Sequence, residues 1–356
     1  MSYKQQEVQQ ALAKAVLERQ GTRPKDWAAR NQIKNEMLSG YGIRVTPETI
    51  LSIVKGGRKA QKTTLDDLGV WLEAEGLLPL ESEKPTLHQS QIGMLSRCGL
   101  QYQYRYVEGK LRPPGVAMVV GTATHRAVEE NLENKINHGE LLTKGEVESL
   151  ASDAFDATWL GDEPELSDLE KEAGKKATKG GAKDKAIQLS SLHHSDIAPI
   201  LTPETVEEKF RLELVGRPVD LAGTIDIVEK DGDSYVVRDT KTSGKTPSAD
   251  TADRSTQLTM YALAVESSRG KRPDKVTLDY LIKLKTPKSV ILESTRDDED
   301  YRSLMNLVDA SSKVIEAGAF MPAPQDAWWC SNRWCGYWNI CPYGARGKTS
   351  PNKLNV

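Results

Sequence analysis

This chain of 356 residues is poor in aromatic residues, has only four cysteines and contains no long apolar run. Its aromatic content of 6% and mean hydropathy of −0.53 are those of a soluble protein. No stretch reaches the roughly 18 apolar residues that a membrane helix needs. The polar N-terminal stretch MSYKQQEVQQ does not resemble a secretion signal. We therefore expect a cytoplasmic protein with no membrane partner, and the length allows two domains.

A strong excess of one charge is also missing, since the formal net charge is −3. Any surface for nucleic acid must therefore be local rather than global. Residues 1–62 have such a local excess, with 12 Lys and Arg against 5 Asp and Glu. The excess suggests a binding surface, although a solvated helical face would show it too.

Residues 1–80 are predicted to form a small module of helices. Apolar residues recur at spacings of three and four in EVQQALAKAVLERQ and PKDWAARNQIKNEMLSG, and both stretches stop at glycine. Proline at the first helical position opens PETILSIVKGG, and TTLDDLGVWLEAEG follows. Residues 45–72 resemble the recognition helix and following loop of repressor-type helix-turn-helix domains, with basic residues at Lys55, Arg58, Lys59 and Lys62. A plain helical docking module is an equally good interpretation.

Residues 81–345 are predicted to form one α/β domain, and residues 77–86 are predicted to link it to the helical module. Apolar periodicity predicts helices in VGTATHRAVEENLENKI, opened by Gly121 and Thr122, in STQLTMYALAVESSRG and in RSLMNLVDASSKVIEAG. Alternation predicts two strands in ETVEEKFRLELVGRPVDLAGTIDIVEK and a hairpin in VTLDYLIKLKTPKSVILEST. Strands flanked by helices indicate an α/β core.

Two segments are predicted to lie outside that core. Residues 161–186 are dense in charge and nearly devoid of large apolar groups, so we expect a mobile insertion there. The polar tail at residues 346–356 is expected to be disordered.

A predicted hairpin contains the most informative pair of residues. The β-rich runs GTIDIVEK and YVVRDTKTS flank the short polar turn DGDS. A turn centred between Gly232 and Asp233 places Asp226 opposite Asp239, with Cβ atoms about 5 Å apart. Alternation places Lys241 on the same face. Two carboxylates this close repel each other, and Lys241 together with a divalent cation would offset that repulsion. Taken alone, the Asp-x-Lys triplet is more typical of a surface hairpin with polar residues on its solvent side.

Five short motifs give this hairpin a context. In order they are GTATH, VEEKF, GTIDIV, VVRDTKTS and QLTMY. Their order and spacing resemble the RecB-like branch of the PD-(D/E)XK nuclease superfamily, over roughly residues 88–344. The resemblance implies a restriction-endonuclease-like α/β fold, with a mixed central sheet flanked by helices. It also implies metal-dependent cleavage of phosphodiester bonds.

The resemblance assigns roles to individual residues. Asp226 and Asp239 would be acidic metal ligands, and the imidazole of His125 and the backbone carbonyl of Thr240 would be further ligands. Lys241 would polarise the attacking water or stabilise charge in the transition state. This set, rich in oxygen ligands, suits Mg²⁺ or Mn²⁺.

Three further residues match supporting positions of the family. Gln257 and Tyr261 are four apart on a predicted helix and match its Gln-x-x-x-Tyr element, which supports the site and contacts DNA. Glu207 matches an acidic residue on the preceding strand, and Glu208 is an equally available neighbour. The other histidines have no motif support and receive no role: His88, His138, His193 and His194.

The few cysteines form a second constellation. Three lie in CSNRWCGYWNIC, namely Cys330, Cys335 and Cys341, and Cys98 lies far upstream. In a cytosolic chain this favours metal binding over disulfides. The arrangement resembles iron–sulfur members of the same branch, the CRISPR-associated nuclease and the AddB-type subunit, in which such cysteines bind a 4Fe-4S cluster. The interval from Cys335 matches that pattern, whereas four residues follow Cys330 where two are usual. Zn²⁺ and free structural cysteines remain the alternatives.

Together these features predict a metal-dependent DNA exonuclease of a phage or bacterium, used in recombination, repair or replication. Its expected partners are DNA and a helicase or single-strand annealing protein. One alternative is a catalytically inactive DNA-binding regulator. Another is a zinc-stapled adaptor subunit of a repair complex.

Overall fold

The computed structural model describes residues 8, 11–12, 15–16, 30, 32–37, 45–54, 68, 71–72, 75 and 84–344. Contacts divide the chain into two units, Met1–Lys84 and Pro85–Val356, and each is described by itself. Most of the predicted linker and the whole predicted tail lie outside the described residues.

The described part of Met1–Lys84 is helical around a small apolar core. Helix α3 (Pro47–Val54) begins where proline follows Thr46, and the Thr46 hydroxyl accepts a hydrogen bond from the Thr49 amide at 3.2 Å. Buried side chains recur at the predicted spacing of three and four; they include Val8, Leu12, Val16, Ile33, Met37, Ile50, Ile53, Leu68 and Trp71. The basic residues of the predicted recognition loop lie outside the described residues, so the helix-turn-helix interpretation stays a prediction.

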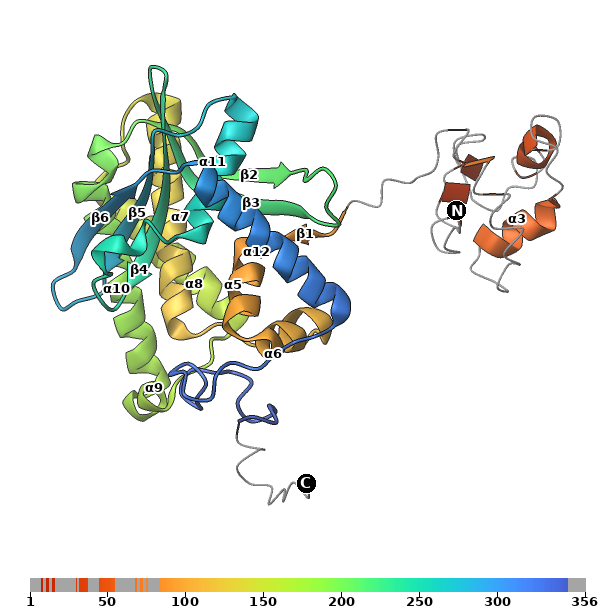
Figure 1. The fold of residues 1–356 in the computed structure, drawn as a ribbon. Helices are drawn as coiled ribbons and strands as arrows, with labels where there is room; N and C mark the ends of the chain where they lie inside the picture. Colours follow the sequence, from red (N-terminus) through yellow and green to blue (C-terminus); the bar gives the residue numbers. More distant parts are fainter. Residues whose placement is uncertain are drawn as a thin grey trace. The chain divides into compact units, whose positions relative to one another are not determined.

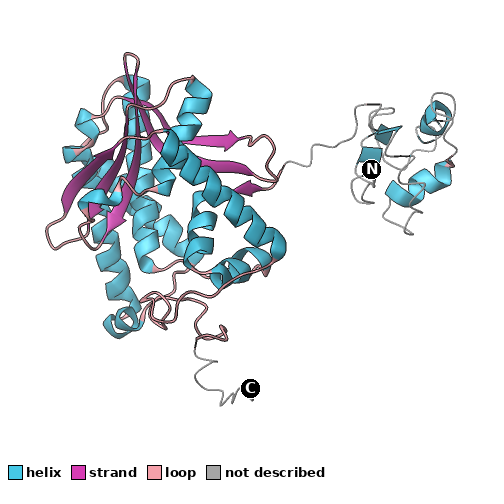
Figure 2. Ribbon diagram, viewed as in Figure 1, coloured by secondary structure: helices cyan, strands magenta, loops and turns pink. Residues whose placement is uncertain are grey.

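A mixed six-stranded sheet forms the centre of Pro85–Val356 (Figures 1 and 2). Its order is β1-β3-β4-β5-β6, with β2 paired to β3. The β1–β3 and β4–β5 pairs are parallel and the others antiparallel. The strands are β1 (Thr86–Leu87), β2 (Pro203–Leu212), β3 (Asp220–Asp231), β4 (Ser234–Ser243), β5 (Lys275–Ile282) and β6 (Lys288–Ser294).

The hairpin of β3 and β4 has the predicted register. Val228 pairs with Val237, and the two-residue turn begins at Gly232, whose φ of +56° lies in the left-handed region that glycine favours. The same register, continued one pair past the ladder's last partners, places Asp226 opposite Asp239.

Helices cover both faces of the sheet. Ile227 and Leu281 pack with α7 (Val116–His138), α8 (Lys144–Asp162) and α10 (Lys175–Asp196). Val228 and Val237 point to the opposite face of the sheet from Ile227. They pack with α11 (Thr256–Arg269) and α12 (Asp298–Ala317). Figure 1 shows the sheet between these two groups. The predicted fold class, a mixed sheet flanked by helices, is therefore confirmed.

Short helices complete the unit. They are α5 (Gln89–Arg97), α6 (Gly99–Tyr102), the π-helical turn η1 (Gln103–Val107), α9 (Asp168–Ala173), and the 3₁₀ turns η2 (Ala198–Ile200) and η3 (Ala249–Thr251). None of the helices in the described parts of the chain combines the length and apolar character needed to span a bilayer.

Two predictions about this unit were wrong. Helix α7 begins at Val116 rather than at Gly121, because apolar residues ahead of the glycine continue its buried face. Residues 161–186 form no mobile insertion but the end of α8, α9 and the start of α10. Lys179 and Lys183 pair with Asp156 of α8 at 2.9 and 2.6 Å, so the dense charge is used in contacts between helices.

Candidate active site

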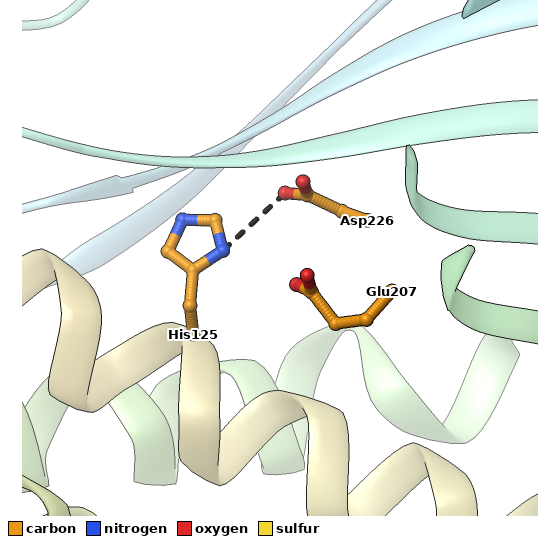
Figure 3. Close-up of side chains that lie close together, drawn as sticks. All are labelled: His125, Glu207 and Asp226. Carbon is orange, nitrogen blue, oxygen red and sulfur yellow. Dashed lines mark ion pairs between the residues drawn. The ribbon is translucent and has the colours of Figure 1, made fainter. Parts of the chain in front are cut away.

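Three side chains from different elements converge beside the sheet (Figure 3). His125 comes from α7, Glu207 from β2 and Asp226 from β3, and one ligand atom of each lies within 4.8 Å of the others. Nδ1 of His125 is 3.3 Å from Oδ2 of Asp226. Two carboxylates and an imidazole at this spacing form a donor set that suits one divalent cation.

Strand geometry brings the two acids of this group together. The antiparallel register of β2 and β3 places Glu207 opposite Asp226. Glu207 has a φ of +47°, which is uncommon for a residue with a side chain and interrupts the regular pleat of β2. Backbone strain of this kind clusters at functional sites.

The structure separates Glu207 from its neighbour Glu208, which the sequence left as equal alternatives. Glu208 accepts a hydrogen bond from Arg269 of α11 at 2.6 Å, and from the Thr205 hydroxyl as well. These bonds keep the pKa of Glu208 below its usual range, with Arg269 as the largest cause. Glu208 therefore holds β2 against α11, and only Glu207 joins the group with His125.

Asp239 and Lys241 form a pair next to this group. Asp239 is fully buried, and Nζ of Lys241 lies 2.6 Å from its Oδ2 and 2.9 Å from its Oδ1. The backbone amide of Thr240 donates to Oδ2 of Asp226 at 2.9 Å, so strand β4 holds the neighbouring carboxylate in place. Asp239 thus lies next to the three convergent side chains, and its assignment as a metal ligand stays a prediction.

Burial is the main influence on the pKa values of the site. Burial raises the pKa of Asp226 and of Asp239, and the nearby Asp226 raises that of Asp239 further, whereas Lys241 lowers both. Burial, followed by the charge of Asp226, raises the pKa of Glu207 to about 7. The pKa of His125 is lowered, mainly by burial. A cation bound among these groups would favour their ionised, metal-binding forms.

Gln257 and Tyr261 lie on one face of α11, as their spacing predicts. Nε2 of Gln257 donates to the phenol oxygen of Tyr261 at 2.7 Å. Burial and the charges of Asp239 and Asp226 raise the pKa of Tyr261, so it remains a neutral phenol. Its ring meets Phe210 edge-on at 5.9 Å, and a Cβ at Gly223 would come within 2.9 Å of Phe210. A side chain at position 223 would therefore push Phe210 against the tyrosine that faces the acids.

Comparison with known proteins identifies the family. The family model described as the PD-(D/E)XK nuclease superfamily matches residues 86–342. The chain belongs to this superfamily. No curated protein matches the sequence significantly.

Two solved structures resemble this nuclease chain. One is a candidate exonuclease from Eubacterium rectale, with 11% identity and a TM-score of 0.44, covering 72% of this chain and 91% of that protein. The other is the protein SSO0001, with 14% identity and a TM-score of 0.34, covering 76% of this chain and 91% of that protein. Identities this low carry no information about substrate.

A buried ionic network that the sequence did not reveal supports the nuclease hairpin. Arg238, adjacent to Asp239 in β4, donates to both carboxylate oxygens of Asp279 in β5 at 2.8 and 3.0 Å. It also pairs with Glu229 in β3, whose other oxygen accepts the Thr202 amide at 2.8 Å. One side chain thus ties three strands together behind the acids. No local sequence pattern indicates this network, because Asp279 meets Arg238 only through the strand order that brings β5 beside β4.

His193 of α10, to which the sequence assigned nothing, is fully buried on the same side as Arg238. Burial lowers its pKa to about 3, and the charges of His125 and Arg238 lower it further. Neither ring nitrogen has a hydrogen-bond partner within the described residues. It is therefore held in the neutral form.

The four cysteines of the nuclease domain come together although more than two hundred residues separate the first from the rest. Cys98, Cys330, Cys335 and Cys341 line one cavity, and none of them forms a disulfide. Sγ of Cys98 accepts the backbone amide of Ala323, and Sγ of Cys335 accepts a bond from Gln101, both at 3.3 Å. No three of these sulfurs lie within 4.8 Å of one another.

Proposed function

We propose that this chain is a metal-dependent deoxyribonuclease of the RecB-like branch, acting as an exonuclease in recombination, repair or replication of a phage or bacterial genome. One observation carries the proposal: His125, Glu207 and Asp226 converge from three elements beside the buried Asp239–Lys241 pair. All five residues lie within the segment that matches the nuclease superfamily.

The residues present fit Mg²⁺ or Mn²⁺. Asp226, Glu207 and His125 would hold the ion, and Asp239 and the backbone carbonyl of Thr240 are proposed as further ligands. The bound ion would neutralise charge on the phosphate and lower the pKa of the attacking water. Two oxygen ligands from separate strands favour a hard cation. Burial raises the pKa of both carboxylic acids, and a bound cation would favour their ionised forms.

Lys241 contributes the fixed positive charge of the mechanism. Asp239 holds its ammonium group at 2.6 Å, so the charge is in place before substrate arrives. Attack on a phosphodiester adds negative charge to the phosphoryl oxygens, and a preorganised cation stabilises that charge. Gln257 donates to the Tyr261 phenol, which lies near Asp239 and Asp226 as a neutral group and adds no charge.

The second part of the proposal is a 4Fe-4S cluster at the four cysteines. Their shared cavity and the two N–H···S bonds support a site for thiolates. Tetrahedral zinc, with Zn–S bonds of about 2.3 Å, requires sulfurs about 3.8 Å apart. The four thiols would suit either group by residue type, so the cluster is proposed from the resemblance of the cysteine pattern and zinc stays the alternative. Iron and sulfide in anaerobically purified protein would support the cluster. Stoichiometric zinc would show that the cysteines bind zinc instead.

The N-terminal unit, Met1–Lys84, is proposed to contact DNA or a partner protein such as a helicase or a single-strand annealing protein. Its local excess of basic residues supports this role. Full-length protein with Lys55, Arg58, Lys59 and Lys62 replaced by alanine should bind DNA more weakly while its rate at saturating substrate stays unchanged.

Cleavage of end-labelled DNA tests the main proposal. Single-stranded and double-stranded substrates, with and without free ends, are incubated with Mg²⁺ or Mn²⁺. Asp239→Ala or Lys241→Ala should abolish cleavage, whereas Lys275→Ala, which removes an exposed lysine paired with Glu293, should not. Wild-type activity in both site variants would contradict the catalytic assignment. DNA binding without any cleavage by the wild-type protein would instead indicate an inactive regulator.

A further inference from the structure

A recess of about 320 Å³ opens beside Lys241. It lies between the starts of helices α5 and α11 and the strands β4 and β5. Its volume is in the range of pockets that bind small ligands. The residues that matter here are Gln89, Lys241, Arg254, Gln257, Leu278 and Tyr280.

The floor of the recess is continuous with the reacting centre. In the parallel register of β4 and β5, Asp239 lies beside Leu278 and Lys241 beside Tyr280. Leu278 is buried and Tyr280 is partly exposed, so the accessible aromatic ring of Tyr280 lies one strand away from the two charged residues. A group bound on this floor would lie next to a phosphate positioned by Lys241.

The wall of the recess carries a second cation. Arg254 is 70% exposed and pairs with the exposed Asp250 at 2.9 Å. Such surface pairs contribute only about 0–1 kcal/mol, so an incoming anion displaces Asp250 with little loss. The forked guanidinium of arginine matches the geometry of a phosphate. Gln89 and Gln257 add neutral hydrogen-bonding groups at the same rim.

We propose that this recess binds the nucleotide adjacent to the cleaved bond, with its base on the ring of Tyr280 and its phosphate at Arg254. An apolar floor next to a cationic rim matches the two halves of a nucleotide. Contact through an aromatic face and a backbone phosphate is independent of base sequence. The inference rests on the proposed nuclease function and extends it by naming how the strand is held.

Equilibrium binding of a short fluorescein-labelled oligothymidylate tests the assignment of Arg254. Fluorescence anisotropy is measured over a series of salt concentrations, with Ca²⁺ replacing Mg²⁺ and the probe checked for intactness. Arg254→Ala should weaken binding about 10-fold. It should also reduce the slope of log K against log salt by about 0.7, because one phosphate contact is lost. Arg302→Ala, which removes an exposed arginine paired with Glu299 on α12, should change neither quantity.

A second pair of variants tests whether the aromatic ring of Tyr280 contacts a base. Tyr280→Ala should weaken binding about 10-fold, since stacking of a base on an aromatic ring is lost. Tyr280→Phe keeps the ring and should restore wild-type affinity, and neither variant should alter the salt slope. Thermal unfolding of each variant confirms that it is folded.

The outcomes separate this inference from the nuclease function. If wild-type protein binds and cleaves DNA while Arg254→Ala and Tyr280→Ala retain its affinity and salt slope, the recess is not the nucleotide site and the nuclease function stands. If wild-type protein neither binds nor cleaves DNA with any metal, both proposals fail.

Discussion

Oδ2 of Asp226 accepts the backbone amide of Thr240 at 2.9 Å, so the carboxylate of one strand is fixed by the main chain of the next. The same oxygen lies 3.3 Å from Nδ1 of His125 on α7. Two elements thereby orient one acid before any cation binds. Such preorganisation is what a metal site needs from its surrounding shell.

Metal binding should distinguish the two adjacent glutamates of β2. Mn²⁺ at about 100 times its dissociation constant should stabilise the wild-type protein by about 2.7 kcal/mol. Glu207→Gln or Asp226→Asn should lose most of this effect in a thermal-shift titration, because each removes a ligand. Glu208→Gln is the matched control, since Glu208 pairs with Arg269 instead. The reverse pattern, with Glu208 required and Glu207 dispensable, would contradict the site.

The stability of the metal-free protein should fall as pH rises through the acidic range. Burial raises the folded-state pKa of Asp239 and Asp226, and that of Glu207 to about 7, above unfolded values of about 3.9 and 4.3. Between about pH 4 and 7 the folded state therefore binds more protons than the unfolded state, and stability decreases as these protons leave.

Urea unfolding in EDTA across this pH range measures the effect. Asp239→Asn removes one ionisable group and should flatten the decline relative to wild type. Saturating Mn²⁺ should reverse the slope, because the metal binds the ionised acids. An unchanged slope in Asp239→Asn would show that this carboxyl ionises normally.

His193 should affect the pH dependence of stability in the opposite direction from the buried carboxylic acids. Its folded-state pKa of about 3 lies below the usual 6.5, so the unfolded state binds the extra proton between these values. Stability from this group is present above about pH 6.5 and decreases as pH falls. His193→Leu should lose less stability on acidification than wild type, whereas His138→Leu, at an exposed position, should follow wild type.

Arg238 should be among the most sensitive residues of the fold. Replacing it by methionine leaves Glu229 and Asp279 buried without their cation. Breaking a buried ion pair in this way costs about 3–5 kcal/mol. Arg217→Met, which breaks a more exposed pair with Asp309, should cost less than about 1 kcal/mol. Chemical denaturation compares the two, and equal losses would mean that the buried network contributes little.

The four cysteines should behave as one unit in the protein as purified. Cys98→Ser and Cys335→Ser should each lower the melting temperature and the bound metal content together, since either loss opens the shared site. The double variant should lose no more than either single variant. Additive losses, with the metal content unchanged, would show that the cysteines contribute only by separate packing.

Local pattern was sufficient for much of the domain. Alternating side chains and the Asp-Gly turn predicted the register that pairs Val228 with Val237, because a two-residue turn fixes the pairing of both strands. A four-residue spacing likewise placed Gln257 within hydrogen-bond reach of Tyr261 on α11. Pattern failed in residues 161–186, because Ala182 and Ala186 pack on the apolar cluster and Lys179 and Lys183 pair with Asp156, so these helices need few large apolar groups.

The sequence by itself determined the β-hairpin, the helices on either side of it and the residue types of the site, because each depends on neighbours within a few positions. Only the tertiary structure decided which acids meet. It selected Glu207 over Glu208, brought His125 beside Asp226 and placed Tyr280 beside Lys241. These contacts join segments far apart in the chain, and their geometry follows from strand order and helix packing, which no local pattern encodes.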